Sequence, residues 1–279
     1  MPALRTVLNI VVYIFAAAGF ILIVGYFAVK YGVTNTTGII DTQRESFLEG
    51  AAGAAPASDT EASLPWSETE EWGTLDAAVR KDTDPLSRAA ADSGVPARLI
   101  AANLITEQLR LFFSEREFYK QIFFPLKILG SQTQFSWGVM GMKEATAIQV
   151  ENNLKDPSSP YYPGPQYAHL LDFTATTTDA IAEERFTRMT DQHNHYWSYV
   201  YAGLFLKEIE TQWTNAGFPI DDRPDILSTL FNIGFEHSTP NANPQVGGAE
   251  IDINGAAYSF GGLAGDFYKS DLLTDILPK

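Results

Sequence analysis

The stretch GVPARLIAANLITE, residues 94–107, does most to decide the fold. Its apolar residues recur at helical spacing, and Ile100, Leu104 and Glu107 fall on one stripe of the expected helix. Glu107 continues an apolar stripe, where a charge is costly unless it has a purpose. Burial disfavours the charged form of a carboxyl, so this position suits a group that delivers protons. The plain alternative is a glutamate at a helix end that pairs with Arg110 or Arg116.

Two further stretches follow Glu107 in the chain. SWGVMGMKEATA, residues 136–147, indicates a Gly/Met turn that opens a second helix. LFNIG, residues 230–234, indicates an Asn/Gly turn at the end of another helix. We expect both turns to face Glu107, which gives an arrangement suited to cleaving polysaccharides.

In this order, the three stretches resemble the motifs of the lytic transglycosylase and goose-type lysozyme family, whose SLT-type domain has the lysozyme fold. The first motif matches at Pro96, Leu99 and Glu107, the second at Ser136, Gly138, Val139, Met140, Met142, Thr146 and Ala147, and the third at Asn232 and Gly234. The resemblance covers roughly residues 86–236. It implies a mainly α, lysozyme-like (α+β) domain that acts on the glycan strands of peptidoglycan.

The resemblance also implies roles for single residues. Glu107 becomes the catalytic acid, and the substrate-binding positions become Ser136, Gly138, Val139, Met140, Gly141, Phe231 and Asn232. The chain departs from the family at three places: Gln108 replaces a serine, Gly141 a glutamine and Phe231 a tyrosine.

Glycosidases commonly use two carboxylates, one on each side of the bond. The candidates for a second, Glu115, Glu117 and Glu144, do not match the family's motifs. The resemblance instead implies a route with one glutamate, which cleaves the MurNAc–GlcNAc β-1,4 bond and leaves a 1,6-anhydro end. Two alternatives stay open: a muramidase that hydrolyses the bond, and a non-catalytic wall-binding or assembly protein on a degenerate lysozyme scaffold.

Composition excludes several other functions. The formal net charge is −15 and no long run of Lys or Arg occurs, so nucleic acid is a poor partner. The chain has no cysteine, which excludes disulfides and thiolate chemistry. His193 and His195 are two residues apart in an expected helix and face different directions, so we expect neither a metal nor a cofactor.

The N-terminus predicts a membrane anchor. Val7 to Val29 is an apolar stretch of 23 residues, about 34 Å long as a helix, and a bilayer core is about 30 Å thick. A cleaved signal peptide is the alternative. Arg5 favours a cytoplasmic N-terminus at residues 1–6, so residues 72–279 are expected to form an exported domain at the inner membrane, tethered by a flexible acidic linker at 30–71. Trp66 and Trp72 mark where the chain docks onto that domain. Partners in an envelope complex are left open.

Periodicity and turn residues predict the other elements. Helices are expected at 74–91, with Asp84 as the N-cap before Pro85, at 145–154, at 179–213 with one interruption, and at 222–234. Asn254-Gly255 indicates a small β-hairpin within 249–258. The aromatic insert 111–134 forms either a packed excursion or a sugar-stacking platform. In the turn-rich loop 158–165, Tyr161 and Tyr162 either pack on the surface or stack on sugar rings.

Overall fold

Helices make up most of the chain in the computed structural model, which describes Arg44 and residues 46–50, 64–113 and 136–279. All of these residues belong to one compact unit, residues 38–114 and 133–279. The expected anchor at 7–29 and residues 114–135 of the aromatic insert lie outside the described residues. Within the described ranges, no helix is both long enough and apolar enough to cross a membrane.

The described elements are mainly α-helices, as the sequence predicts. They are the 3-10 helix η1 (Pro65–Glu68), α3 (Glu70–Lys81), α4 (Thr83–Ser93), α5 (Ala97–Phe113), β1 (Ser136–Trp137), β2 (Met142–Lys143), α7 (Glu144–Lys155), η3 (Pro165–Tyr167), α8 (Thr178–Thr190), α9 (Tyr196–Asn215), α10 (Pro224–Ile233), η4 (Phe235–His237), β3 (Glu250–Ile253), β4 (Ala256–Ser259) and α11 (Phe260–Lys269).

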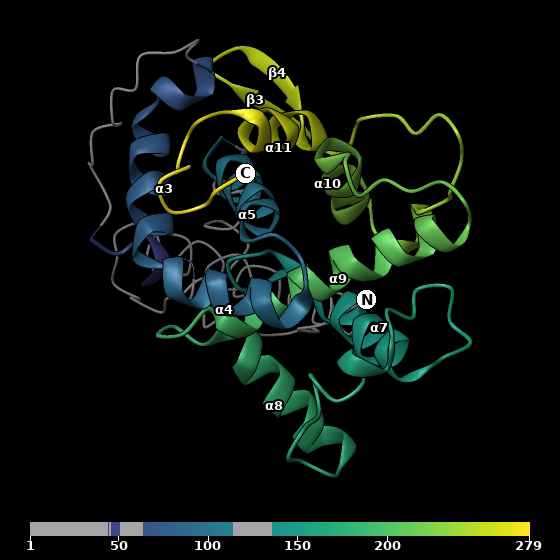
Figure 1. The fold of residues 1–279 in the computed structure, drawn as a ribbon. Helices are drawn as coiled ribbons and strands as arrows, with labels where there is room; N and C mark the ends of the chain where they lie inside the picture. The colour runs from purple at the N-terminus through teal and green to yellow at the C-terminus, as the bar shows by residue number, and fades with distance from the viewer. Residues whose placement is uncertain (1–43, 45, 51–63, 114–135) are drawn as a thin grey trace, which may run out of the picture. The chain divides into compact units, whose positions relative to one another are not determined.

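Helix α5 forms the centre of this arrangement (Figure 1). It contacts α3, α4, α9, α10 and α11, and every residue from 98 to 109 is buried. A helix that is apolar around most of its circumference is stable only when other elements surround it. The expected stripe of Ile100, Leu104 and Glu107 is therefore one side of a helix that is buried on all sides.

Arg98, near the start of α5, ties the C-terminal segment to this core. Its side chain is 1% exposed and donates hydrogen bonds of 2.6–2.9 Å to five backbone carbonyls, those of Phe267, Tyr268, Ser270, Leu272 and Leu277. The guanidinium also lies over the Phe267 ring, 4.7 Å from its centroid. Within the described part of the chain, this buried cation is thus satisfied by peptide oxygens in place of a carboxylate.

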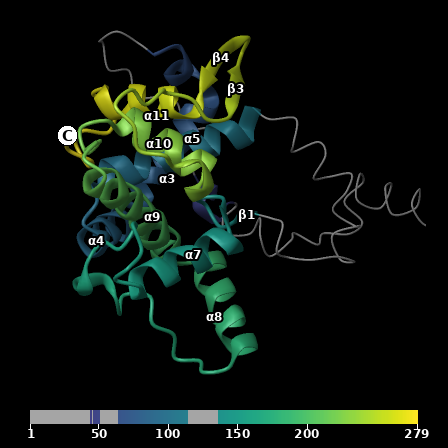
Figure 2. The ribbon, with the colours of Figure 1, turned by 90° about the vertical axis from the view of Figure 1, so that its right-hand side faces the viewer.

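Two short antiparallel hairpins complete the fold. The predicted hairpin is confirmed: β3 pairs with β4, and Asn254 and Gly255 adopt φ values of 55° and 88°. Two successive left-handed residues match the twist of the paired strands. The other hairpin, β1–β2, was not predicted as strands, because each strand has only two residues. Strand β1 lies against α8 (Figure 2), and β2 lies against α7.

The predicted helix 74–91 is instead two helices that break at Asp82. The Asp82 carboxylate accepts a hydrogen bond of 2.5 Å from the Tyr199 hydroxyl and lies 2.5 Å from Nδ1 of His195. His195 is the N-cap of α9 and Tyr199 lies in its first turn, so the chain turns at the residue that they bind. The prediction that Asp84 is the N-cap is wrong, because α4 begins at Thr83 and its N-cap is Asp82. Pro85 lies inside the first turn, where a missing N–H leaves no helical bond unmade.

The remaining helix predictions are confirmed. Helix α7 matches 145–154, and α8 and α9 match 179–213 with an interruption at 191–195. Helix α10 starts at Pro224 and ends before Gly234, whose φ of 92° favours glycine. Trp66 and Trp72 are both buried, with ring centroids 5.2 Å apart in a T-shaped contact.

Parts of the predicted linker 30–71 belong to the folded unit. Phe47 is fully buried, and the chain from Leu64 onward packs through Trp66 into the core. A buried aromatic ring gives a short segment the apolar contact that it needs to stay docked. The acidic residues Glu70 and Glu71 begin α3, where carboxylates stabilise the first turn of a helix.

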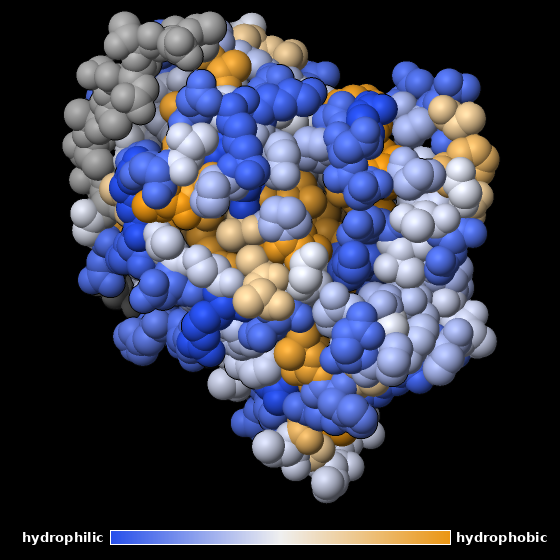
Figure 3. All heavy atoms as spheres, in the orientation of Figure 1, coloured by the Kyte–Doolittle hydropathy of each residue, from blue (hydrophilic) through white to orange (hydrophobic). Residues whose placement is uncertain are grey.

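The surface is hydrophilic over much of the face seen in Figure 3, with an apolar area at its centre. Among the described residues, the exposed large hydrophobic side chains are Ile148, Phe218, Ile233 and Val246. Singly exposed apolar side chains are normal on a monomer.

Candidate functional site

Glu107 lies in the second half of α5, and its residue is 4% exposed. The helix continues to Phe113, so Glu107 does not end it, and Leu111 to Phe113 of the predicted insert belong to α5. Arg110 follows one turn later and donates from Nε to Oε2 of Glu107 at 2.9 Å and from Nη2 to Oε1 at 2.5 Å. The ion pair between Glu107 and Arg110, which the sequence analysis gave as the alternative to a catalytic role, is therefore present.

The Gly/Met turn closes the hairpin β1–β2. Ser136 pairs with Lys143 and Trp137 with Met142, and Gly141 N–H donates to Gly138 O at 3.2 Å. Gly138 and Gly141 have φ values of 66° and 61°, in the left-handed region that residues with a Cβ rarely adopt. The turn therefore requires glycine at both ends.

This turn lies directly on the carboxylate of Glu107. A Cβ atom added to Gly141 would stand 2.3 Å from Oε1 of Glu107 and 2.8 Å from its Cδ. Next to it, the side-chain amide of Gln108 donates to the backbone oxygen of Val139 at 2.6 Å. The first two stretches singled out in the sequence thus meet at a single point.

Several residues predicted to bind substrate are committed to packing instead. Val139 and Met140 are 0% and 1% exposed as whole residues, so neither their side chains nor their backbone face solvent. Phe231 is also buried, and its ring lies 5.2 Å from that of Phe205 and 6.4 Å from that of Phe260. A stacking contact of Phe231 with a sugar ring is incompatible with this position. Ser136 is half-buried in β1.

Asn232, the key residue of the third stretch, has a structural partner. Its Oδ1 accepts the N–H of Ala249 at 2.7 Å, and a Cβ atom at Gly248 would come within 2.9 Å of the same oxygen. Asn232 therefore holds the loop before β3. The first two stretches meet at Glu107, whereas the side chain of the third is used to fix this loop.

The contact between Gly141 and Glu107 predicts a sharp effect of adding one methyl group. We expect Gly141→Ala to displace the carboxylate and to lower any activity of Glu107 about 100-fold. The left-handed backbone adds a cost of about 1–2 kcal/mol in the free energy of unfolding. Gly217→Ala is the matched control, because Gly217 has a φ of 82° and nothing within 4 Å of an added Cβ. Equal losses of activity in the two variants would contradict the contact.

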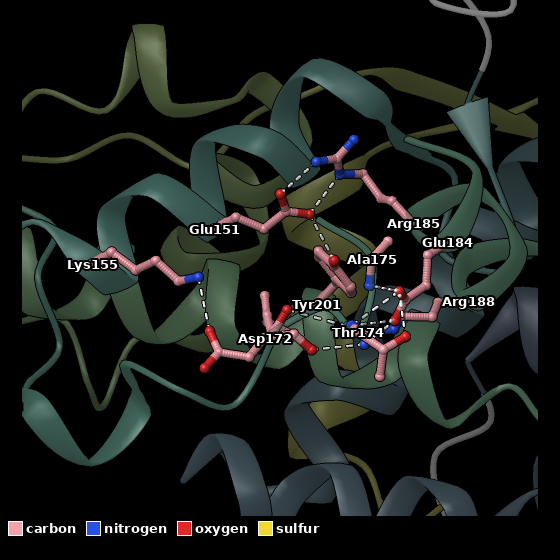
Figure 4. A network of polar contacts seen from close by, with 10 residues as sticks. Glu151, Lys155, Asp172, Thr174, Ala175, Glu184, Arg185, Arg188 and Tyr201 are labelled. Carbon is pink, nitrogen blue, oxygen red and sulfur yellow. Dashed lines mark hydrogen bonds and ion pairs between the residues drawn. The ribbon is translucent and has the colours of Figure 1, made fainter. Parts of the chain in front are cut away.

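Glu144, a candidate for a second carboxylate, faces a different cluster. Its Oε1 lies 3.7 Å from Nη1 of Arg185, which forms a bidentate pair of 2.6 and 2.7 Å with Glu151 (Figure 4). The hydroxyl of Tyr201 donates to the same Glu151 at 2.7 Å, and burial raises the pKa of Tyr201 far above its usual value. This cluster joins α7, α8 and α9. Glu115 and Glu117 lie outside the described residues.

The same network continues to the loop before α8 (Figure 4). Glu184 accepts the N–H groups of Ala175 and Thr174, and these bonds lower the pKa of its carboxyl. Arg188 donates to Glu184 at 2.6 Å and to the Asp172 backbone oxygen at 2.7 Å. Such a satisfied network fixes the loop 172–175 against α8.

Tyr161 is half-buried and uses its hydroxyl within the fold. The hydroxyl donates to Phe235 O at 3.1 Å, and the two rings form a T-shaped contact at 4.8 Å. This position favours the packing interpretation of Tyr161 over sugar stacking.

Glu208 on α9 is a buried acid that sequence reasoning missed. It is fully buried, and its Oε2 accepts from Nδ2 of Asn153 at 2.9 Å. Its Oε1 has no hydrogen-bond partner among the described residues. Burial raises the pKa of Glu208 well above its usual value, against a smaller opposing effect of Asn153. Its place between Lys207 and Ile209 in an apolar helix is the signal that could have found it.

The neutral form of Glu208 predicts how stability depends on pH. The folded-state pKa is raised, so its contribution to stability is fully present below the unfolded pKa of 4.5 and is lost as pH rises towards the folded value. We expect Glu208→Gln to remove this loss, because the amide stays neutral at every pH. Urea unfolding at pH 5 and pH 8 should then differ less in the variant than in the wild type. An unchanged pH dependence would contradict a neutral Glu208.

Comparison of the chain with models of known families, with curated proteins and with solved structures finds no match.

Proposed function

We propose that this chain is a membrane-anchored peptidoglycan lytic transglycosylase with a lysozyme-like domain and Glu107 as its single catalytic carboxyl. The observation that carries the proposal is the contact between Gly141 and Glu107. Two stretches about thirty residues apart, which resemble consecutive motifs of one family, meet at the carboxyl that this chemistry requires. Because Gly141 has no Cβ, the backbone of the turn can approach the Glu107 carboxyl closely.

In this proposal Glu107 delivers a proton to the glycosidic oxygen, and the substrate's acetamido group stabilises the developing positive charge. Glu107 then takes the proton from the muramyl 6-hydroxyl as that oxygen closes on the anomeric carbon. The carboxyl is restored, no water is consumed, and the product has a 1,6-anhydro end. Acid catalysis requires a positioned proton donor within hydrogen-bond reach of the leaving oxygen.

Arg110 sets a condition for this chemistry. A bidentate arginine stabilises a carboxylate, and a carboxylate accepts protons rather than delivering them. Glu107 can therefore act as the acid only when Arg110 moves away, which a substrate that enters beside the turn would bring about.

The same pair favours a second candidate, a wall-binding protein in which Glu107 serves the fold. In both cases the apolar stretch 7–29 would anchor the chain once in the inner membrane, with the domain outside the cytoplasm and glycan strands as its partner.

Mass spectrometry of muropeptides after incubation of the full chain with purified peptidoglycan tests the function. Anhydro ends support a transglycosylase, and reducing ends assign a muramidase instead. Glycan binding without new ends assigns the wall-binding protein. If the chain neither binds nor cleaves glycan strands, both candidate functions are wrong.

A further inference from the structure

A short N-terminal segment, Arg44 and residues 46–50, contacts residues of the folded unit that are distant from it in the sequence. Phe47 is fully buried, and its ring makes a T-shaped contact with that of His195 at 5.8 Å. Lys81 Nζ donates to the backbone oxygens of Ser46 at 2.6 Å and Glu49 at 3.3 Å. The segment is therefore held by the buried ring of Phe47 and by charge-assisted hydrogen bonds from Lys81.

Arg44 extends this docking to the helix of Glu107. Its Nε donates to Oε1 of Gln108 at 2.8 Å, and its guanidinium lies over the Phe112 ring, 4.8 Å from the centroid. Both acceptors are on α5, on either side of the residue that pairs with Glu107. The N-terminal segment and the catalytic helix thus share a polar contact.

The side-chain amide of Gln108 links Arg44 to the Gly/Met turn by two hydrogen bonds. It is fully buried, and the nitrogen end of its amide donates to Val139 O at 2.6 Å, while the oxygen end accepts from Arg44. A flipped amide would place two donors against each other at Arg44 and two acceptors against each other at Val139. Arg44 therefore fixes which way the amide points, and the amide fixes the turn two residues before Gly141.

We propose that Gln108 and Arg44 are positioning residues that hold the turn 138–141 against Glu107, which makes the docked N-terminal segment a working part of the site. The proposal rests on the proposed function for its catalytic consequence, and on the contacts above for its geometry. Gln108 replaces the serine that is usual in the family, and an amide is long enough to reach both partners. The docked segment, Arg44 and residues 46–50, then acts on the site through Gln108.

The experiment compares full-length variants by two measurements. Arg44→Ala removes the orienting donor, Gln108→Met removes both ends of the amide at similar volume, and Phe47→Ala loosens the segment without touching Gln108. Hydrogen exchange reports on the turn through the amide of Gly141, which donates to Gly138. Steady-state cleavage of soluble glycan strands reports on the site.

We expect each variant to speed exchange in residues 136–142 by about 10-fold and to lower kcat about 10- to 100-fold, with KM within about twofold. Arg44→Lys should recover much of both values, because an ammonium can still donate to Gln108. Arg80→Ala is the matched control, since Arg80 is an exposed arginine that pairs with Asp76 and Asp275. It should change neither measurement.

Unchanged exchange in both Arg44→Ala and Gln108→Met would overturn the proposal. So would faster exchange that is equally large in α9 and α11, because the variants would then weaken the whole fold. A wild-type chain that cleaves nothing removes the proposed function, and the exchange measurement alone then decides whether Arg44 and Gln108 position the turn.

Discussion

We expect Glu107→Gln to abolish the proposed cleavage of peptidoglycan, with a loss of at least about 1000-fold in kcat, because it removes the one proton that the proposed reaction moves. The amide keeps the shape of the side chain and one acceptor for Arg110. Arg110 loses part of a charge-assisted pair, but its side chain is 16% exposed and can turn to water. We therefore expect a loss of only about 1–2 kcal/mol in the free energy of unfolding. Release of anhydro muropeptides measures the effect.

Glu208→Gln provides the matched control for this variant. Both residues are buried glutamates in long helices, but Glu208 is fully buried and hydrogen-bonded to Asn153. It should retain activity within about twofold of the wild type, since a group closed to solvent cannot touch a glycan. Residual activity of one tenth in Glu107→Gln would assign the acid to another residue.

Local chemistry explains which parts of the fold could be predicted. Asn254-Gly255 dictates its hairpin because two neighbouring residues must adopt the left-handed region. Pro224 and Gly234 likewise mark the start and end of α10 through properties of the single residues. These signals act within a few residues and do not depend on what packs around them.

The missed features depend on partners that are distant in the sequence. Asp82 breaks a helix because His195 and Tyr199 bind it from more than one hundred residues away. Nothing near Phe47 indicates the pocket that buries it, and the composition around it is typical of a linker. A periodic pattern reports which face is buried, but not which polar group meets it there.

The predictions for the candidate site also include one that agrees with the structure and others that depend on partners outside the motifs. The order of the motifs predicted that the Gly/Met turn would face Glu107, and the contact at Gly141 agrees with that prediction. The roles of Phe231 and Asn232 were inferred from identity or similarity to a motif alone. Their neighbours, Phe205 and Ala249, decide their roles instead, and the motif does not contain them.

Arg98→Met should be the most destabilising of the substitutions considered, with an expected loss of about 3–5 kcal/mol in the free energy of unfolding. Methionine fills a similar volume but leaves five carbonyl oxygens without their shared donor. A buried acceptor left unsatisfied costs about 1–3 kcal/mol, and some of these oxygens can turn to water. Burial lowers the pKa of Arg98, yet a guanidinium stays charged in proteins.

The geometry makes the effect specific to the fork of arginine. Arg98→Lys keeps the charge, but an ammonium has three donors and cannot reach carbonyls spread over residues 267–277, so it should recover less than half of the loss. Arg88→Met is the control, because Arg88 is exposed and lies over the Tyr196 ring at 4.6 Å, a contact worth about 0.5–1 kcal/mol. Urea unfolding of the three variants measures the difference. If Arg98→Met lowers the free energy of unfolding no more than Arg88→Met does, then apolar packing, and not Arg98, holds the C-terminal segment against α5.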